Sequence, residues 1–218
     1  MLSLKSFGYR YHQNDPYIFR DLTLDIPSGS IIRLEGSNGS GKSTFIYCLT
    51  GFICHYLGGE IEGCIDFKGE DIHDMPVKQR IQTINAVFQD PEVQISFAVA
   101  FEELKCQLLY CENLSYDKEQ QINELLHRFG LNISDSTKTS ELSWGQKKMI
   151  CLISLIVNDP PVWLLDEPFS GLSVAHSDIL AHIILEKLQQ GRIILFSDHT
   201  SYPITCHQTI RFSYHDPN

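Results

Sequence analysis

The sequence has no hydrophobic run long enough to cross a lipid bilayer. Its longest apolar stretches, such as Met149–Val157 and Val162–Leu165, are far shorter than the ~20 residues that a membrane-spanning helix needs. The opening residues MLSLK also lack the apolar segment of a secretory signal peptide. If the protein serves a membrane process, we expect it to do so by docking onto membrane components.

Positive charge is also scarce. Lysine and arginine together number 17 against 27 aspartate and glutamate, which gives a formal net charge of −10 at pH 7. Nucleic-acid backbones are bound through basic patches, so this balance argues against a nucleic-acid partner. It does not exclude a nucleotide, because one lysine and a set of backbone N–H groups can hold a triphosphate locally.

Paired cysteines are missing as well. The seven cysteines are odd in number, and no two form a Cys-x-x-Cys pair. This pattern fits neither a disulfide framework nor a zinc site and indicates a reducing compartment. The chain also lacks a low-complexity linker and an internal repeat, so its 218 residues predict one domain or two tightly joined lobes.

Short apolar runs at both ends of the chain have the character of β-strands. Residues 30–35 read as a strand that runs into a glycine-rich turn, and a helix is expected to follow from about Lys42. The stretch Gly58–Lys68 alternates apolar and polar residues, as the strands of a hairpin do. Residues 162–165 and 192–197 are typical of buried parallel strands.

The middle of the chain is helical in character. Asp117 and Gln120 are spaced as a capping box, and apolar residues then follow at i, i+3, i+4 and i+7. Another amphipathic stretch over about 179–188 is ended by Gly191. Together with the strands, these helices predict an α/β core with a helical insertion. The apolar positions of the first helix are Ile122, Leu125, Leu126 and Phe129.

The strongest motif is the glycine-rich turn between the first strand and helix. Residues 36–44 read GSNGSGKST, a full match to G-x-x-x-x-G-K-S/T. Its glycines let successive N–H groups point at a β-phosphate, and the helix adds its positive end. We expect Lys42 to reach the β- and γ-phosphates and Ser43 to ligate Mg²⁺. The expected nucleotide contacts are Gly36, Ser37, Asn38, Gly39, Ser40, Gly41, Lys42, Ser43 and Thr44.

Two acidic residues follow the apolar run 162–165. Beside a phosphate-binding loop, the first of them, Asp166, is placed to hold Mg²⁺. The second, Glu167, would face the γ-phosphate and polarise an attacking water. Without that loop, two acids after a strand would more often be a solvated strand end. With it, we expect Asp166 to be a metal ligand and Glu167 to be a catalytic base.

Residues 142–146, LSWGQ, lie between these two motifs and resemble the LSGGQ signature of ATP-binding-cassette (ABC) proteins. A serine hydroxyl and a glycine N–H at the start of a helix would form another anion site. The resemblance covers most of the chain, from Tyr11 to His199. It implies an ATPase that uses ATP and Mg²⁺. The implied contacts to the γ-phosphate of a second subunit are Ser143, Gly145 and Gln146, in a homodimer or a heterodimer.

The same resemblance implies the fold. It predicts a P-loop NTPase of the α/β class, with a RecA-like parallel sheet core, an antiparallel β-subdomain and a helical ABC subdomain. The catalytic core would comprise residues 1–89 and 159–218 of a single nucleotide-binding domain, and the helical subdomain would span about 90–158.

Three further residues take roles from the resemblance. Tyr11 is similar to the aromatic residue that stacks on adenine, and Tyr9 is the other candidate. The alternative is that Tyr11 is an ordinary core or surface tyrosine without a role in binding. Gln89 resembles the Q-loop glutamine that touches Mg²⁺ and the attacking water. His199 resembles the switch histidine that hydrogen-bonds the γ-phosphate.

The chain departs from the family pattern at four positions. Trp144 replaces a glycine of the signature, and Ser173 stands where the loop after Glu167 usually ends in aspartate. Lys148 and Ser154 each replace an arginine of the family. None of these changes removes a residue needed for hydrolysis, but reduced activity or an asymmetric heterodimer stays open.

Residues 87–95, VFQDPEVQI, resemble the Q-loop of energy-coupling-factor and cobalt-type importers. This resemblance implies an ATPase subunit at the cytoplasmic face of the cell membrane, bound to transmembrane permease subunits and driving uptake of a vitamin or metal ion. Two alternatives stay open: the ATPase of an ABC exporter, and a cassette that works outside transport or hydrolyses ATP weakly.

Overall fold

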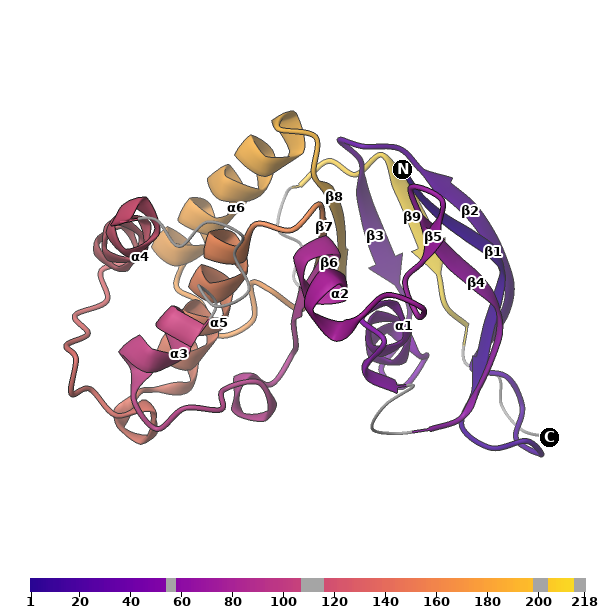
Figure 1. The fold of residues 1–218 in the computed structure, drawn as a ribbon, viewed down its shortest axis with the longest axis horizontal. Helices are drawn as coiled ribbons and strands as arrows, with labels where there is room; N and C mark the ends of the chain where they lie inside the picture. The colour runs from indigo at the N-terminus through magenta and orange to yellow at the C-terminus, as the bar shows by residue number, and fades with distance from the viewer. Residues whose placement is uncertain (54–57, 107–115, 198–203, 214–218) are drawn as a thin grey trace.

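The computed structural model describes residues 1–53, 58–106, 116–197 and 204–213. Two β-sheets stand beside each other, with helix α1 (Lys42–Leu49) between them and several longer helices beyond one sheet (Figure 1). This arrangement confirms the expected α/β class. Within the described ranges, no helix is both long enough and apolar enough to cross a membrane.

One sheet is antiparallel and has the strand order β2-β1-β4-β5. The strand character expected over Gly58–Lys68 is confirmed, because this stretch forms one strand that pairs with β1 on one side and makes a hairpin with β5 on the other. The tight turn comes later, at Lys68 and Gly69, whose φ values of 57° and 95° suit a two-residue hairpin. The strands are β1 (Leu2–Arg10), β2 (Phe19–Ile26), β4 (Glu60–Phe67) and β5 (Glu70–Asp71).

The other sheet is parallel throughout, in the order β6-β7-β8-β3-β9. Strands β7 and β8 are buried along their whole length, as their apolar sequences predict. Their alternate residues serve two cores, one shared with α1 and the antiparallel sheet and the other with the longer helices. The strands are β3 (Ile31–Glu35), β6 (Ile84–Val87), β7 (Val162–Asp166), β8 (Ile193–Ser197) and β9 (Gln208–Arg211).

Most helices lie on the far side of the parallel sheet from α1 (Figure 1). The apolar stripe expected from Ile122 to Phe129 is buried there, which confirms that amphipathic helix. The side chain of Asp117 lies outside the described part, so its capping role stays a prediction. The helices are α2 (Val77–Thr83), α3 (Ala100–Cys106), α4 (Tyr116–Arg128), α5 (Trp144–Asn158), α6 (Val174–Gln189) and the short 3-10 helices η2 (Pro91–Val93) and η4 (Thr139–Glu141).

Parallel pairing brings the carboxyl ends of the strands to one edge of the sheet. The loops that leave β3, β6 and β7 at this edge carry the glycine-rich turn, Gln89 and Glu167. Ligands of open α/β sheets bind at such an edge. The fold therefore gathers at one place the three motifs that the sequence keeps far apart.

Candidate nucleotide and magnesium site

The glycine-rich turn joins β3 to α1, which begins at Lys42 as expected. Gly41, the residue before the helix, has a φ of 102°, in the left-handed region that favours glycine. A Cβ atom on Gly41 would also lie only 2.4 Å from Cγ2 of Ile18. The turn therefore needs glycine here, and the first turn of α1 presents its unpaired N–H groups and positive dipole end to an anion.

Lys42 is almost buried, with 7% of its surface exposed. Its Nζ donates hydrogen bonds to the carbonyl oxygens of Gly36, at 2.7 Å, and Ser37, at 2.9 Å. Lys42 also lines the cavity beside the turn. Its ammonium can thus exchange a carbonyl oxygen for a phosphate oxygen and keep its hydrogen bonds satisfied.

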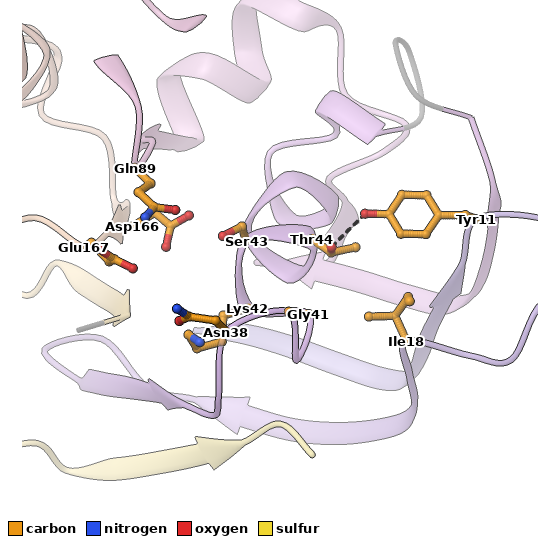
Figure 2. Close-up of a pocket in the computed structure, with 11 residues that line it drawn as sticks. Tyr11, Ile18, Asn38, Gly41, Lys42, Ser43, Thr44, Gln89, Asp166 and Glu167 are labelled. Carbon is orange, nitrogen blue, oxygen red and sulfur yellow. Dashed lines mark hydrogen bonds between the residues drawn. The ribbon is translucent and has the colours of Figure 1, made fainter. Parts of the chain in front are cut away.

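A cavity of about 460 Å³ opens beside the glycine-rich turn. Figure 2 shows Gln89, Asp166 and Glu167 on one side of the turn and Tyr11 with Ile18 on the other. Charged groups thus gather at one end and a ring with an aliphatic side chain at the other, as a nucleotide requires. The lining residues are Tyr11, Ile18, Asn38, Gly39, Gly41, Lys42, Ser43, Thr44, Gln89, Asp166 and Glu167.

Asp166 ends β7 and is 2% exposed. Its Oδ1 accepts a short hydrogen bond from the hydroxyl of Ser197, the last residue of β8. Its Oδ2 is buried and has no hydrogen-bond partner within the described residues. An orphaned carboxylate oxygen in a cavity that Ser43 and Gln89 also line fits a divalent cation with oxygen ligands, so the residues present fit Mg²⁺.

Glu167 follows in a left-handed backbone conformation, with a φ of 48°. Its N–H holds that conformation by donating to both the carbonyl and the hydroxyl oxygen of Ser197, each at 3.1 Å. A non-glycine residue in this region stores strain, which is common at functional sites. Here the turn directs the Glu167 carboxylate to the cavity beside Lys42 (Figure 2).

The two tyrosines expected near an adenine have different environments. Tyr9 is fully buried in the core, and its hydroxyl donates to the carbonyl oxygen of Gly58 at 2.9 Å. Tyr11 is 37% exposed and lines the cavity. Its hydroxyl oxygen shares a hydrogen bond of 2.8 Å with Oγ1 of Thr44. Tyr9 is therefore excluded as the residue that stacks on adenine, while the stacking role of Tyr11 stays a prediction.

Gln89 lies in a loop that is fixed from several sides. The side chain of Gln94 accepts from the N–H of Phe88 at 3.1 Å and donates to the carbonyl of Ala86 at 3.0 Å. The Asp90 carboxylate caps η2 by accepting from the N–H of Glu92 at 2.9 Å. These bonds fix the end of β6, so the backbone that presents Gln89 to the cavity is well defined.

The signature residues do not line this cavity. Ser143 caps α5, and its hydroxyl accepts from the N–H of Gln146 at 3.3 Å while Gln146 Oε1 accepts from the N–H of Ser143 at 2.8 Å. This capping box leaves the hydroxyl hydrogen of Ser143 and the N–H of Gly145 available to an anion at the helix start. His199 lies outside the described residues, so its role stays a prediction.

Two of the departures from the family pattern, Ser173 and Lys148, have defined local environments, and a third, Ser154, does not. Ser173 caps α6 by accepting from the N–H of His176 at 3.3 Å, a task that aspartate performs equally well. Lys148 is fully buried, and burial lowers the pKa of its ammonium to about 8, although the charges of Asp166 and Glu167 oppose this shift. The hydroxyl of Ser154 is buried without a hydrogen-bond partner in the described part of the chain, and nothing in the structure explains it.

Sequence reasoning missed three residues of the site. Ile18 enters the cavity from the segment before β2, and no motif marks it. The sequence predicts Ser197 as the end of a strand but does not reveal its hydrogen bonds to Asp166 and Glu167, because these depend on the pairing of β7 with β8. Lys148 stands out in the sequence only as a departure from the family pattern, because its contact with the carbonyl of Phe88 joins segments that are far apart in the chain.

A parallel sheet with a phosphate-binding turn at its edge, flanked by an antiparallel sheet and helices, defines a P-loop nucleotide-binding protein. A family model described as "ABC transporter" matches residues 19–170, and the chain belongs to that family. Two solved structures with the same fold, an ATP-binding subunit of an ABC transporter and an ATP-binding cassette bound to ADP and Pi, have TM-scores of 0.83 and 0.77, which confirms the predicted P-loop NTPase fold.

Three similar proteins illustrate the relationship. A putative ABC transporter ATP-binding protein from Treponema denticola is 29% identical over 91% of this chain. An energy-coupling factor transporter ATP-binding protein, EcfA2, from Methanospirillum hungatei is 32% identical over 91% of it. The chain spans 40% and 49% of the lengths of these two relatives. The solved structure of cbiO1 from Clostridium perfringens, part of the ABC transporter complex cbiONQ, is 26% identical with a TM-score of 0.73, covering 97% of this chain and 84% of that one.

Proposed function

We propose that this chain is the ATP-hydrolysing subunit of an ABC transporter. The observation that carries the proposal is the cavity in which the orphaned Oδ2 of Asp166 and the carboxylate of Glu167 stand opposite the helix start that holds Lys42. In this proposal residues 1–89 and 159–218 form the catalytic core, and residues 90–158 form the helical subdomain.

The residues divide the work of hydrolysis. The N–H groups of residues 36–44 and the ammonium of Lys42 hold the phosphates, and Tyr11 stacks on the adenine. Ser43, Gln89 and Asp166 would hold Mg²⁺, which would supply charge neutralisation to the phosphates. Glu167 accepts a proton from water as the water oxygen bonds to the γ-phosphorus and the bond to the bridging oxygen of ADP breaks. His199 hydrogen-bonds the departing γ-phosphate.

A second cassette completes the proposed site. Ser143, Gly145 and Gln146 do not line the cavity of their own chain, yet they form an anion-accepting helix start. The proposal therefore places them over the γ-phosphate held by a second subunit, identical or related. Two ATP molecules would lie between the two subunits, each contacted by both chains.

A groove next to the Q-loop supports docking to a permease. It has a volume of about 410 Å³ and includes Phe52, Val77, Ile84 and Phe88, with 56% of Val77 exposed. Phe88 precedes Gln89, so an apolar helix seated in the groove would press on the backbone of a proposed Mg²⁺ ligand. We assign this groove to a short cytoplasmic helix of a transmembrane permease subunit, and we propose on that basis that the chain works at the cytoplasmic face of the membrane.

Energy-coupling-factor uptake of a vitamin or metal ion is the proposed kind of transport. The similarity to EcfA2 and to cbiO1 supports it, as does Gln94, whose hydrogen bonds give a structural reason for the last glutamine of the Q-loop pattern. Co-purification from detergent-solubilised native membranes with a membrane scaffold and a small capture subunit would agree with this assignment. Recovery with only a large exporter-like permease would overturn it.

Phosphate release measures the proposed activity. Glu167→Gln should bind ATP with the affinity of the unmodified protein but lose activity by about 100-fold or more, the usual cost of removing a general base. Lys42→Ala is the matched control, because it should lose affinity for ATP, whereas Glu167→Gln should keep it. Unchanged phosphate release by Glu167→Gln would refute the role of Glu167. ATP binding without phosphate release in the unmodified protein would favour a cassette that does not turn over.

A further inference from the structure

Lys148 occupies a position where a charged side chain is rare. It lies in α5, five residues after Ser143, and none of its surface is exposed. Its Nζ donates hydrogen bonds to three backbone carbonyls: those of Phe88 at 2.6 Å, Gln89 at 3.1 Å and Asp166 at 3.1 Å. A buried ammonium is stable only when its donors are satisfied, and these three acceptors match its three N–H bonds.

The three carbonyls belong to two segments that are distant in sequence. Phe88 and Gln89 follow β6, and Asp166 ends β7. A single ammonium thus holds the backbone of two proposed Mg²⁺ ligands at a fixed spacing. Because Lys148 is part of α5, the same bonds tie both ligands to the helix that begins with the signature residues.

The neighbouring lysine makes a different contact. Lys147 pairs with the carboxylate of Glu92; the side chain of Lys147 is 12% exposed and that of Glu92 is 59% exposed. Because water reaches the Glu92 carboxylate, this ion pair is partly screened. The two adjacent lysines therefore both link α5 to the Q-loop, but only Lys148 reaches the backbone of Gln89 and Asp166.

We propose that Lys148 is a positioning residue that sets the distance between Gln89 and Asp166 and couples it to the signature helix. This inference rests on the proposed function, because it assumes that the two residues hold Mg²⁺ with ATP. Groups behind metal ligands orient them, and their loss typically weakens metal binding or activity by about 10- to 100-fold. The role does not require Lys148 to touch nucleotide or metal.

Four variants of the full chain separate positioning from packing. Lys148→Met removes the ammonium at similar length, and Lys148→Arg keeps charge and donors. Lys147→Met removes the ion pair with Glu92, and Leu152→Val removes one methylene group from the apolar core of the same helix. Each protein is tested for ATP affinity without metal, for the affinity of its ATP complex for Mn²⁺ by electron paramagnetic resonance, for kcat and KM, and for thermal unfolding.

The expected pattern is specific to Lys148→Met. Its ATP complex should bind Mn²⁺ at least about tenfold more weakly. Its kcat should fall to a similar extent, while metal-free ATP affinity and KM stay within about twofold, since the phosphate-binding turn is untouched. Lys148→Arg should recover most of the Mn²⁺ affinity, and Lys147→Met should behave as the unmodified protein. If Lys148→Met does not fold, Lys148→Gln takes its place under the same criteria.

Two results would overturn the inference. One is normal Mn²⁺ affinity in folded Lys148→Met. The other is an equal loss of Mn²⁺ affinity in Leu152→Val, which would mean that any loosening of α5 has the same effect. Failure of the proposed function looks different: the unmodified protein would release no phosphate, yet the Mn²⁺ titration of its ATP complex would still report on Lys148.

Discussion

The indole ring of Trp144 lies against the backbone of Gly171. A Cβ atom on Gly171 would lie 2.2 Å from Cζ3 and 2.5 Å from Cε3 of that ring, closer than any side chain can approach. Gly171 also has a φ of 72°, in the region that glycine tolerates best. The tryptophan that replaces a signature glycine is therefore matched by a glycine in the loop after Glu167, and the two loops are packed together within one chain.

Gly171→Ala should break this packing. The added methyl group would displace the ring of Trp144, and with the unfavourable φ we expect a loss of about 1–3 kcal/mol in the free energy of unfolding. Urea unfolding measures the loss, and tryptophan fluorescence should shift to the red as the ring becomes more exposed. The double variant Gly171→Ala with Trp144→Gly should recover part of the loss, because only the backbone strain then remains. If the double variant instead lost as much stability as the two single variants together, the contact between the ring and Gly171 would be contradicted.

Ser197→Ala should weaken the metal end of the cavity. The hydroxyl of Ser197 donates to Oδ1 of Asp166 and accepts from the N–H of Glu167, so its removal leaves a buried carboxylate oxygen without its partner. We expect a loss of stability of about 1–3 kcal/mol. Added MgATP should restore more stability to Ser197→Ala than to the unmodified protein if Mg²⁺ takes over the carboxylate. Thermal unfolding with and without MgATP measures both effects, and equal stabilisation of the two proteins would argue against Asp166 as a ligand.

Contiguous features of the site could be read from the sequence. The glycine-rich turn is built from consecutive residues, 36–44, so a local motif contains the whole of it. Likewise, β7 and β8 are buried on both faces, and their apolar runs predicted this. The helix stripe from Ile122 to Phe129 was equally local, since one helix face carries all of its apolar positions.

The features that could not be read depend on pairing between distant segments. Ser197 meets Asp166 across 31 positions, and Lys148 meets Phe88 across 60. No local pattern encodes such contacts, because they follow from which strands become neighbours in the sheet. The same reason explains why the alternation over Gly58–Lys68 predicts a hairpin strand but does not identify β1 as its second partner.

The Glu167→Gln variant should form a dimer when it binds ATP. If Ser143 and Gly145 close over the γ-phosphate of a second chain, a variant that keeps ATP intact should accumulate as a dimer. Light scattering should show a shift from monomer to dimer with ATP and Mg²⁺, and none with ADP. Ser143→Ala in the Glu167→Gln background is the control, since it removes a hydroxyl donor outside the chain's own cavity and should reduce dimerisation without reducing ATP binding. A shift that survives this change would disagree with the assigned contact.

Cys151 should make stability depend on alkaline pH. It is a free thiol in α5, only 2% exposed, and burial raises its pKa to about 12 from an ordinary value of 9.0. At pH 8 and below the thiol is almost fully protonated in both the folded and the unfolded chain, so it has little effect on the pH dependence there. As the pH rises from 9 towards 12, the unfolded chain loses this proton while the folded chain keeps it, which favours unfolding by up to about 1.4 kcal/mol per pH unit.

Cys151→Ala removes the thiol and leaves Lys148, whose charge interacts with that of Cys151, in place. Urea unfolding at pH 8, 9, 10 and 10.5 should give a difference in the free energy of unfolding that changes little below pH 9. Above pH 9 the unmodified protein should lose stability faster than the variant. Iodoacetamide at pH 8 should leave Cys151 unmodified in the folded chain and alkylate it in urea, as peptide mass spectrometry can show. Parallel stability profiles above pH 9, or rapid alkylation of Cys151 in the folded protein, would mean that this thiol is not buried in solution as it is in the structure.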